Sequence, residues 1–392
     1  MKPVRLVTFM ILASGLSAVW APAAVPAAVH TVNPGDSIQA AVDAAAPGDT
    51  VKVMPGDYVG VPAGSVSAAI RITKPLKLVA KSKLKNNVRV RILPGAGQTS
   101  GILVEPANPG DPDVDGVQIK GFTVEGFHNN GIWLRHVNNF KIQGNETINN
   151  LENGIWPTLS ANGQVKKNVS YGSEDSALWV EASENVRVLK NELHHSPTGL
   201  EITVSKNVQA QKNEVHDNTV GIGLYHPSAA GLPPLQPISE NGDWLISGNY
   251  VHHNNLPNSA PPGSMSAALP PGGGILVLGV DRVTVRNNRV ENNGFFGVGV
   301  IDYCLAVAGT DFDCATNPPE VEPAPDDNEV TGNAVAFNGG MPPGGVFDIL
   351  AADLSFFAPP LIPVSPVGGT NNCFSDNSPD ATTAFITPNQ CM

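Results

Sequence analysis

Aromatic and acidic residues occupy one position of a short phrase that recurs every 22 or 23 residues. Residues 131–134 read Gly-Ile-Trp-Leu, and similar phrases begin at residues 154, 177, 199 and 221. Side chains alternate along a β-strand, so the third residue of each phrase points away from the apolar residues beside it. These outward residues are Trp133, Trp156, Trp179, Glu201 and Gly223. With neighbouring strands about 4.8 Å apart, the three tryptophans predict a flat aromatic platform for binding sugar rings, with Tyr225 and His226 at its end.

A second outward row lies two residues further along the same strands and supplies groups for acid and base chemistry. It places Arg135 and Glu181 along the platform, beside Glu201. Glu174 and Asp175, in the turn before the third tryptophan, are the best-placed acid pair for general acid and base catalysis. The predicted catalytic residues are Glu174, Asp175, Glu181 and Glu201 as acids or bases and Arg135 as a charge stabiliser. The alternatives are a solvated acidic turn, and tryptophans that pack beneath long loops.

Three histidines recur at matching positions of consecutive repeats. His194, His216 and His252 each follow an asparagine by three residues, and Asp217 comes directly after the second histidine. Imidazoles on adjacent strands, together with a carboxylate, are typical ligands of a soft divalent metal. The predicted ligands are His194, His216, Asp217 and His252. Stacked neutral histidines that bind no metal are the alternative.

The stretch from Asp111 to Gly116 reads Asp-Pro-Asp-Val-Asp-Gly and is similar to the start of a calcium-binding loop. An EF-hand also requires an acidic residue at the twelfth position and helices on both sides. Here the twelfth position is Phe122, and no helical pattern flanks the loop. Two interpretations remain: calcium bound by Asp111, Asp113 and Asp115 in another kind of loop, or a solvated acidic turn.

The repeat itself predicts the fold, because a fixed period of this length is typical of a solenoid whose units stack to form a core. Glycine (40) and proline (35) are abundant, and the short β-branched runs between them indicate an all-β chain. Asparagines recur at residues 145, 168, 191 and 213 and, more widely spaced, at 249, 288 and 333. Asparagine tolerates left-handed backbone and bonds its copy on the next strand, which predicts a ladder at a turn. The wider spacings indicate insertions, chiefly 227–272 and 303–325.

A short amphipathic helix is predicted ahead of the first strands. Apolar residues from Ile38 to Ala45 have helical spacing, Asp36 is placed to cap the first turn, and Gln39 can complete a capping box. Such a helix would cover the open end of the solenoid, where unpaired strand edges favour aggregation.

The beginning of the chain resembles an export signal. Lys2 and Arg5 precede an apolar run over residues 6–20, and small residues follow, which predicts a signal peptide of residues 1–27 cleaved after Ala27. An N-terminal membrane anchor is the alternative. The remaining chain is divided into a solenoid of residues 28–345 and a C-terminal cap or tail of residues 346–392. We expect a secreted or periplasmic protein that has no membrane contact after cleavage.

Four cysteines lie in the last quarter of the chain. An even number predicts two disulfides once the protein is outside the reducing cytosol. Of the three connectivities, we predict the local pairs Cys304–Cys314 and Cys373–Cys391. Unpaired buried thiols are the alternative.

Charge is distributed unevenly along the chain. The formal net charge is -12, and residues 301–392 contain 12 acidic residues but no lysine or arginine. Eight basic residues lie between Arg71 and Arg91. Nucleic-acid binding requires a net basic face, so we expect no nucleic-acid partner. The composition leaves the oligomeric state open.

Residues 33–41, Asn-Pro-Gly-Asp-Ser-Ile-Gln-Ala-Ala, and repeats such as Lys-Asn-Glu-Val-His-Asp-Asn at 212–218 resemble the pectin-lyase-like superfamily of β-helix proteins. The resemblance covers about residues 31–345 and is nearest to the mannuronan-epimerase-like and periplasmic copper-binding branch. It implies a right-handed parallel β-helix of about ten coils. The Asp-Pro-His-Asp/Glu motif of the epimerases is absent, as are the polygalacturonase Asn-Thr-Asp and Gly-His-Gly motifs and the pectate lyase Arg-x-Pro-x-x-Arg motif. No catalytic residue is therefore carried over from the superfamily.

Together these patterns predict an exported β-helix protein that binds a polysaccharide on an outer strand face. If the protein is an enzyme, the resemblance implies a polysaccharide lyase, epimerase or glycoside hydrolase. The alternative is a non-catalytic scaffold or metal-handling protein, because this fold hosts many functions.

Overall fold

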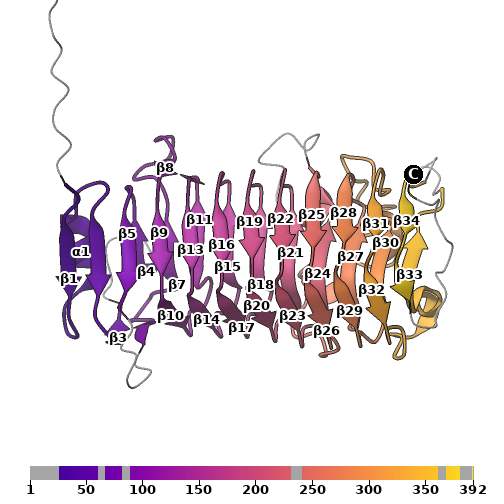
Figure 1. Ribbon diagram of the computed structural model, residues 1–392, viewed down its shortest axis with the longest axis horizontal. Coiled ribbons are helices and arrows are strands. Elements are labelled where there is room, and N and C mark those ends of the chain that lie inside the picture. Colours follow the sequence, from indigo (N-terminus) through magenta and orange to yellow (C-terminus); the bar gives the residue numbers. More distant parts are fainter. Residues whose placement is uncertain are drawn as a thin grey trace, which may run out of the picture.

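The computed structural model describes residues 26–60, 67–81, 89–230, 241–360, 368–379 and 391. The predicted signal peptide lies outside these residues except for its last two positions. The described chain forms an elongated stack of coils (Figure 1), in which most coils contribute one strand to each of three long parallel sheets.

The first sheet contains twelve strands within the described residues. They are β1 (Val29–Val32), β2 (Thr50–Val53), β5 (Lys77–Ala80), β9 (Gln118–Lys120), β13 (Lys141–Gln143), β16 (Gln164–Lys166), β19 (Arg187–Leu189), β22 (Gln209–Gln211), β25 (Trp244–Ser247), β28 (Val283–Arg286), β31 (Glu329–Thr331) and β34 (Cys373–Ser375).

The second sheet contains eleven strands in the same part of the chain. They are β3 (Gly56–Val59), β6 (Val90–Leu93), β10 (Phe122–Glu125), β14 (Glu146–Ile148), β17 (Val169–Tyr171), β20 (Glu192–His194), β23 (Glu214–His216), β26 (Tyr250–His252), β29 (Arg289–Glu291), β32 (Ala334–Ala336) and β35 (Ser378–Pro379).

The third sheet contains ten described strands and carries the repeated phrase. They are β4 (Ala68–Ile72), β7 (Ser100–Val104), β11 (Ile132–Arg135), β15 (Asn153–Thr158), β18 (Ser176–Glu181), β21 (Thr198–Thr203), β24 (Val220–Tyr225), β27 (Gly273–Leu278), β30 (Phe296–Ile301) and β33 (Ala352–Phe357). A small parallel pair, β8 (Val114–Asp115) and β12 (Val137–Asn138), lies at the turn that follows the third sheet.

The predicted register of the repeat is confirmed. Ile132 pairs with Ile155, Ile155 with Leu178 and Leu178 with Leu200, and all four side chains are buried in one continuous core. Each large apolar side chain buried in this way contributes about 1.5–3 kcal/mol relative to an exposed one. The coils extend past the predicted boundary at residue 345, because β33, β34 and β35 pair with the strands of the preceding coil. The described residues 352–357, 373–375 and 378–379 therefore continue the stack of coils.

The predicted asparagine ladder runs along the turn between the first and second sheets. The Asn168 backbone N–H and its Nδ2 both donate to Oδ1 of Asn191, each at 3.0 Å, and Asn191 makes the same two contacts with Asn213. The left-handed backbone expected of asparagine belongs instead to the preceding residues, for example Lys167 and Lys190. The asparagine side chain points into the turn to bond its neighbours, which leaves the tight bend to the residue before it.

Helix α1 (Ile38–Ala44) covers the first coil as predicted, although its cap differs. Ser37 Oγ, not Asp36, accepts the Ala40 N–H at the helix start. Asp36 instead accepts the Asn33 N–H, and Gln39 contacts Asp43 and the backbone of Arg71. Within the described residues, no helix has the length and apolar character needed to span a membrane.

A second apolar cluster, here called the outer cluster, covers the outer face of the late strands of the third sheet. It joins residues of β24, β27 and β30 to the insertions that contain η1 (Pro227–Ala230), η3 (Ser266–Ala268), α2 (Tyr303–Ala306) and η4 (Gly345–Leu350). The predicted disulfides Cys304–Cys314 and Cys373–Cys391 are both present, and the first lies within this cluster.

Candidate functional site

The three tryptophans of the repeated phrase form a continuous stack on the outer face of the third sheet. Ring centroids are 5.0 Å apart between Trp133 and Trp156 and 5.1 Å between Trp156 and Trp179, with interplanar angles of 5°. This register was predicted, but the flat platform was wrong. An indole is wider than the strand spacing, so the rings stand on edge and cover one another's faces. Sugar rings can meet the edges of this stack but cannot lie on both faces of its central ring.

Four acidic side chains lie next to the stack and are here called the carboxyl cluster. Glu181 comes from β18 and Glu201 from β21, while Glu152 and Asp175 lie in the turns that lead into β15 and β18. The Asp175 N–H donates to the Glu152 carbonyl at 3.1 Å, so the two turns are aligned. Glu181 and Glu201 are 2% and 5% exposed, whereas Asp175 is half-buried and Glu152 is exposed. The cluster therefore reaches from the surface to a buried interior.

Burial raises the pKa of every member of the cluster, and repulsion by other members adds to this effect for Glu201, Glu181 and Glu152. Burial followed by the charge of Asp175 raises the pKa of Glu201 well above its usual range, against a hydrogen bond from Ser176. Burial raises the pKa of Glu181 to about 7, with smaller contributions from Asp175 and Glu152. The pKa values of Asp175 and Glu152 are also raised. Partial burial of the carboxyl group is the main cause for both, and the charge of Asp175 adds to it for Glu152.

Hydroxyl groups, not cations, are the hydrogen-bonding partners of the buried carboxyls. Ser176 Oγ donates to Glu201 Oε2 at 2.6 Å, and Thr158 Oγ1 donates to Glu181 Oε2 at 3.0 Å. The Trp156 indole N–H also favours ionised Glu181, although its nitrogen makes no hydrogen bond of full geometry. Ser266, from the 227–272 insertion, donates to Asp175 Oδ1. The insertion therefore contributes directly to the carboxyl cluster.

Tyr225 closes the far end of the carboxyl cluster. Its hydroxyl lies 3.2 Å from Thr198 Oγ1, and its side chain is buried within the outer cluster. Burial and the charges of Glu201 and Asp175 raise the pKa of Tyr225 well above its usual range. Tyr225 is thus a neutral hydroxyl that can donate a hydrogen bond inside the site.

The structure brings together most, but not all, of the predicted site residues. Asp175, Glu181, Glu201 and Tyr225 meet beside the tryptophan stack. Other predicted residues lie elsewhere: Glu174 has no side-chain hydrogen bond or ion pair within the described residues, Arg135 is exposed three strands away from Glu201, and His226 is buried beneath Tyr303. Burial lowers the pKa of His226 to about 4, and its Nε2 faces the Glu322 carbonyl, so it packs the loop instead of lining an open surface.

Glu152 is a member of the cluster that the sequence reasoning missed. It lies 23 residues before Asp175, which is the period of the repeat at this point. The same rule that aligned the tryptophans therefore aligns these two acids. The period of the repeat is therefore the signal that identifies Glu152 as a neighbour of Asp175.

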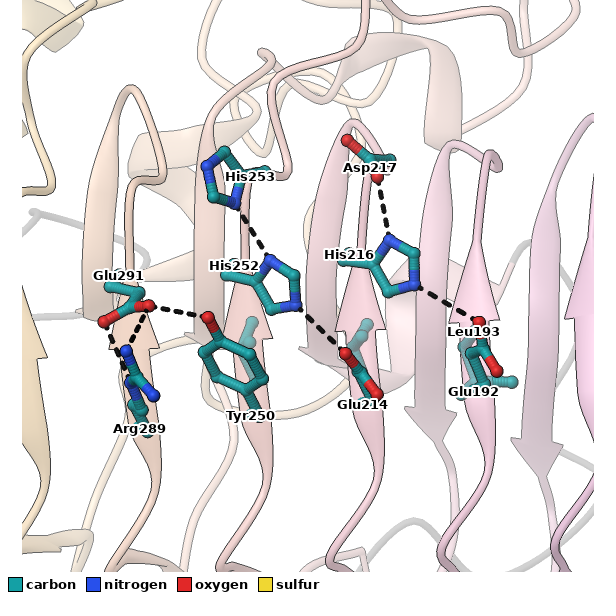
Figure 2. Close-up of polar contacts among 12 residues, drawn as sticks. Glu192, Leu193, Glu214, His216, Asp217, Tyr250, His252, His253, Arg289 and Glu291 are labelled. Atoms are coloured by element: carbon teal, nitrogen blue, oxygen red, sulfur yellow. Dashed lines mark hydrogen bonds and ion pairs between the residues drawn. The ribbon is translucent and has the colours of Figure 1, made fainter.

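The predicted metal ligands form a row on the second sheet, away from the carboxyl cluster. Rings of Tyr171, His194, His216 and His252 stack with centroids 4.6, 5.0 and 5.1 Å apart. Figure 2 shows His216 bonded to Asp217 (2.8 Å) and His252 facing Glu214 (3.5 Å). Burial, followed by the charges of His216 and His195, lowers the pKa of His194 to about 4. Across the described residues, no three acidic, histidine or cysteine side chains are grouped to hold a metal.

The predicted calcium ligands turn toward separate partners. Asp111 accepts from the Asn108 backbone at 2.9 Å, Asp115 accepts from Asn139 at 2.7 Å, and Asp113 pairs with His136 at 3.6 Å. Three carboxylates directed apart do not form the shared oxygen cage that calcium requires. The arrangement matches the solvated acidic turn.

Comparison with known proteins agrees with the fold. The family described as "Right handed beta helix region" matches residues 100–232. No curated protein sequence matches the chain. The A-module of mannuronan C-5 epimerase AlgE4 from Azotobacter vinelandii is 12% identical, with a TM-score of 0.52 over 90% of this chain and 94% of that one. DFA-IIIase from Arthrobacter chlorophenolicus A6, without its lid, is 14% identical, with a TM-score of 0.57 over 94% of this chain and 89% of that one.

At identities of 12% and 14%, the similarity to these two structures shows the fold alone. The family match adds that the β-helix is right-handed. The protein is a right-handed parallel β-helix.

Proposed function

We propose that the protein hydrolyses glycosidic bonds of a neutral polysaccharide at the carboxyl cluster. The observation that carries this proposal is the meeting of Glu201, Glu181 and Asp175, three carboxyls with raised pKa values, on the outer face of the third sheet. Glycoside hydrolysis needs one carboxyl that is protonated near neutral pH and another that is ionised. Groups whose pKa values are perturbed by burial and by each other are typical of such sites.

In the proposed reaction, Glu201 acts as the general acid and Asp175 as the general base. Glu201 donates its proton to the glycosidic oxygen as the bond from that oxygen to the anomeric carbon breaks. Asp175, at the surface side of the cluster, takes a proton from water, and the resulting hydroxide adds to the anomeric carbon. Water is thereby divided between the two products. The neutral Tyr225 hydroxyl is a hydrogen-bond donor next to the acid.

The charges in the cluster favour a neutral sugar over a uronate. Among the described residues, no lysine or arginine forms an ion pair or hydrogen bond with Asp175, Glu181 or Glu201. A uronate carboxylate would add a like charge to a site that is already acidic, which is unfavourable at short distance. Lyase and epimerase reactions on uronates require that charge to be stabilised, so hydrolysis fits the site better.

Two further observations support a polysaccharide substrate and export from the cytosol. The similar AlgE4 module is named as a mannuronan epimerase, so a structurally similar protein acts on a polysaccharide. The two disulfides support the proposed export to an oxidising compartment, because disulfides are rare in the cytosol.

The proposal is tested by incubating the protein with neutral polysaccharides (inulin, levan, arabinan, galactan, xylan, β-1,3-glucan) and with alginate and polygalacturonate. We expect new reducing ends from at least one neutral polymer. Glu201→Gln and Asp175→Asn should each lower kcat about 100- to 10,000-fold. Glu174→Gln, next to Asp175 in sequence but outside the cluster, is the matched control and should retain activity.

The pH profile separates the two roles. Loss of the basic limb in Glu201→Gln and of the acidic limb in Asp175→Asn would match the assignment of acid and base. Unsaturated sugar products, detected by their ultraviolet absorbance, would show a lyase instead. Absence of any product across the panel would favour the non-catalytic alternative.

A further inference from the structure

We infer that the site acts on the end of a sugar chain and not on internal bonds. This inference rests on the proposed function and concerns which part of the polymer can reach the carboxyl cluster. It follows from the contrast between the two sides of that cluster along the third sheet.

The early side of the cluster is partly open. The outward row there runs from Arg71 through Leu103, Trp133 and Trp156 to Trp179. Arg71, Trp133 and Trp156 are partly exposed, whereas Leu103 and Trp179 are 5% and 8% exposed. At its beginning, a surface hollow of 330 Å³ is lined by Arg71, Arg135 and the 105–111 loop. A polymer can therefore approach the carboxyl cluster along the edges of the tryptophan stack.

The late side of the cluster is closed. The outward residues that continue the same rows on β24, β27 and β30 include Tyr225, Leu276 and Ile301, which are 3%, 6% and 4% exposed. They are covered by the outer cluster, which includes Leu269 and Tyr303 from the two insertions. An internal segment of a polymer has to leave the site on both sides, and here the second exit is filled with packed side chains.

The closure is held by specific contacts and is not a loose covering. The Tyr303 ring stacks on His226 at 4.7 Å, and the Tyr303 N–H donates to the Pro323 carbonyl at 3.0 Å. The Cys304–Cys314 disulfide fixes the loop that follows. From the Trp133 strand to the Glu201 strand there are three strand spacings, about 14 Å. This length accommodates a short terminal segment of a sugar chain, which would stop against Tyr225.

The order in which products appear tests the inference. The wild-type protein is incubated with the neutral polysaccharides of the panel above, and size-exclusion chromatography follows the polymer while ion chromatography follows the small sugars. We expect mono- or disaccharides from the first time points while the mass of the remaining polymer stays high. An early fall of polymer mass with a broad range of oligosaccharides would overturn the inference but leave the proposed function intact.

A variant at the closed end sharpens this test. Tyr303→Ala opens the packing beyond Tyr225 and should shift the products toward internal cleavage. Tyr250→Ala, the same substitution on the outer face of the second sheet, should leave the product pattern unchanged. If Tyr303→Ala does not fold, the wild-type time course still decides. Absence of hydrolysis on every polymer would overturn both this inference and the proposed function, which distinguishes that outcome from internal cleavage.

Discussion

At the scale of single residues, the carboxyl cluster lowers the stability of the folded protein. The row that holds Glu181 also holds Thr158 and Thr203, which are buried in the same register and carry no charge. A side chain like these threonines would fill the position without the cost of burying an ionisable group. Buried acids that raise one another's pKa values therefore indicate a functional site, because residues at functional sites commonly lower the stability of the folded protein.

Glu181→Gln should stabilise the protein at neutral pH. Below the ordinary pKa of 4.5, Glu181 is protonated in both the folded and the unfolded chain and contributes no pH dependence. As the pH rises toward the folded-state pKa of about 7, the unfolded chain releases its proton first, so folding loses stability over this window. The neutral glutamine should recover up to about 3 kcal/mol of unfolding free energy above pH 7.

Urea denaturation at pH values from 4 to 8 would measure this difference. Glu174→Gln is the control, because Glu174 is outside the cluster. A stabilisation by Glu181→Gln that did not change between the acidic and neutral ends of this range would show that Glu181 is not held protonated by burial.

At the scale of elements, the turns between the first and second sheets are held by side-chain amides. Each ladder asparagine bonds both neighbouring coils, and Asn191 also donates from Nδ2 to the Val165 carbonyl at 3.1 Å. These contacts satisfy backbone groups that the turn would otherwise leave buried and unpaired. The ladder is therefore part of the scaffold that keeps the third sheet in register.

Asn191→Ala should destabilise the protein strongly. It removes the acceptor for the Asn168 N–H and Nδ2 and leaves the Val165 carbonyl without its partner. At about 1–3 kcal/mol for each buried group left unsatisfied, we expect a loss of at least about 3 kcal/mol. Asn138→Ala is the matched control, since Asn138 accepts a single exposed bond from Asn162 and should cost less than about 1 kcal/mol. Equal effects in chemical denaturation would contradict a structural role for the ladder.

At the scale of the whole molecule, the insertions determine where the open face of the third sheet ends. The coils stack in one direction (Figure 1). The last quarter of the chain, which holds 12 acidic residues and no lysine or arginine, also supplies α2 and η4 to the outer cluster. In the early coils, Arg71, Trp133 and Trp156 leave the outer face of the third sheet partly exposed. The outer face of the third sheet is thus partly open in the early coils and covered in the late coils.

The Cys304–Cys314 disulfide should stabilise the closed half selectively. A loop of this sequence separation, 10 residues, is expected to contribute about 3 kcal/mol. Replacing both cysteines by serine should increase amide hydrogen exchange in residues 303–314, because the loop is released. The amides of the asparagine ladder should keep their protection, since each coil contacts mainly its neighbours. Uniform loss of protection along the chain would contradict this division.

The sequence alone determined which residues are neighbours. A period of 22 or 23 residues places Trp156 next to Trp133, Asn191 next to Asn168, and His216 next to His194, because parallel strands of successive coils pair in a constant register. Glu152 and Asp175 obey the same rule. The local disulfides were also predictable, since short loops bring their cysteines together.

Only the tertiary structure decided what covers these neighbours. Indole rings at strand spacing must stand on edge, so the stack offers edges and not a platform. Ser266 reaches Asp175 across 91 residues, and Tyr303 covers His226, through insertions whose paths no repeat period encodes. The contacts of such loops depend on long-range packing, which is why the rows could be predicted from sequence and the closed end of the site could not.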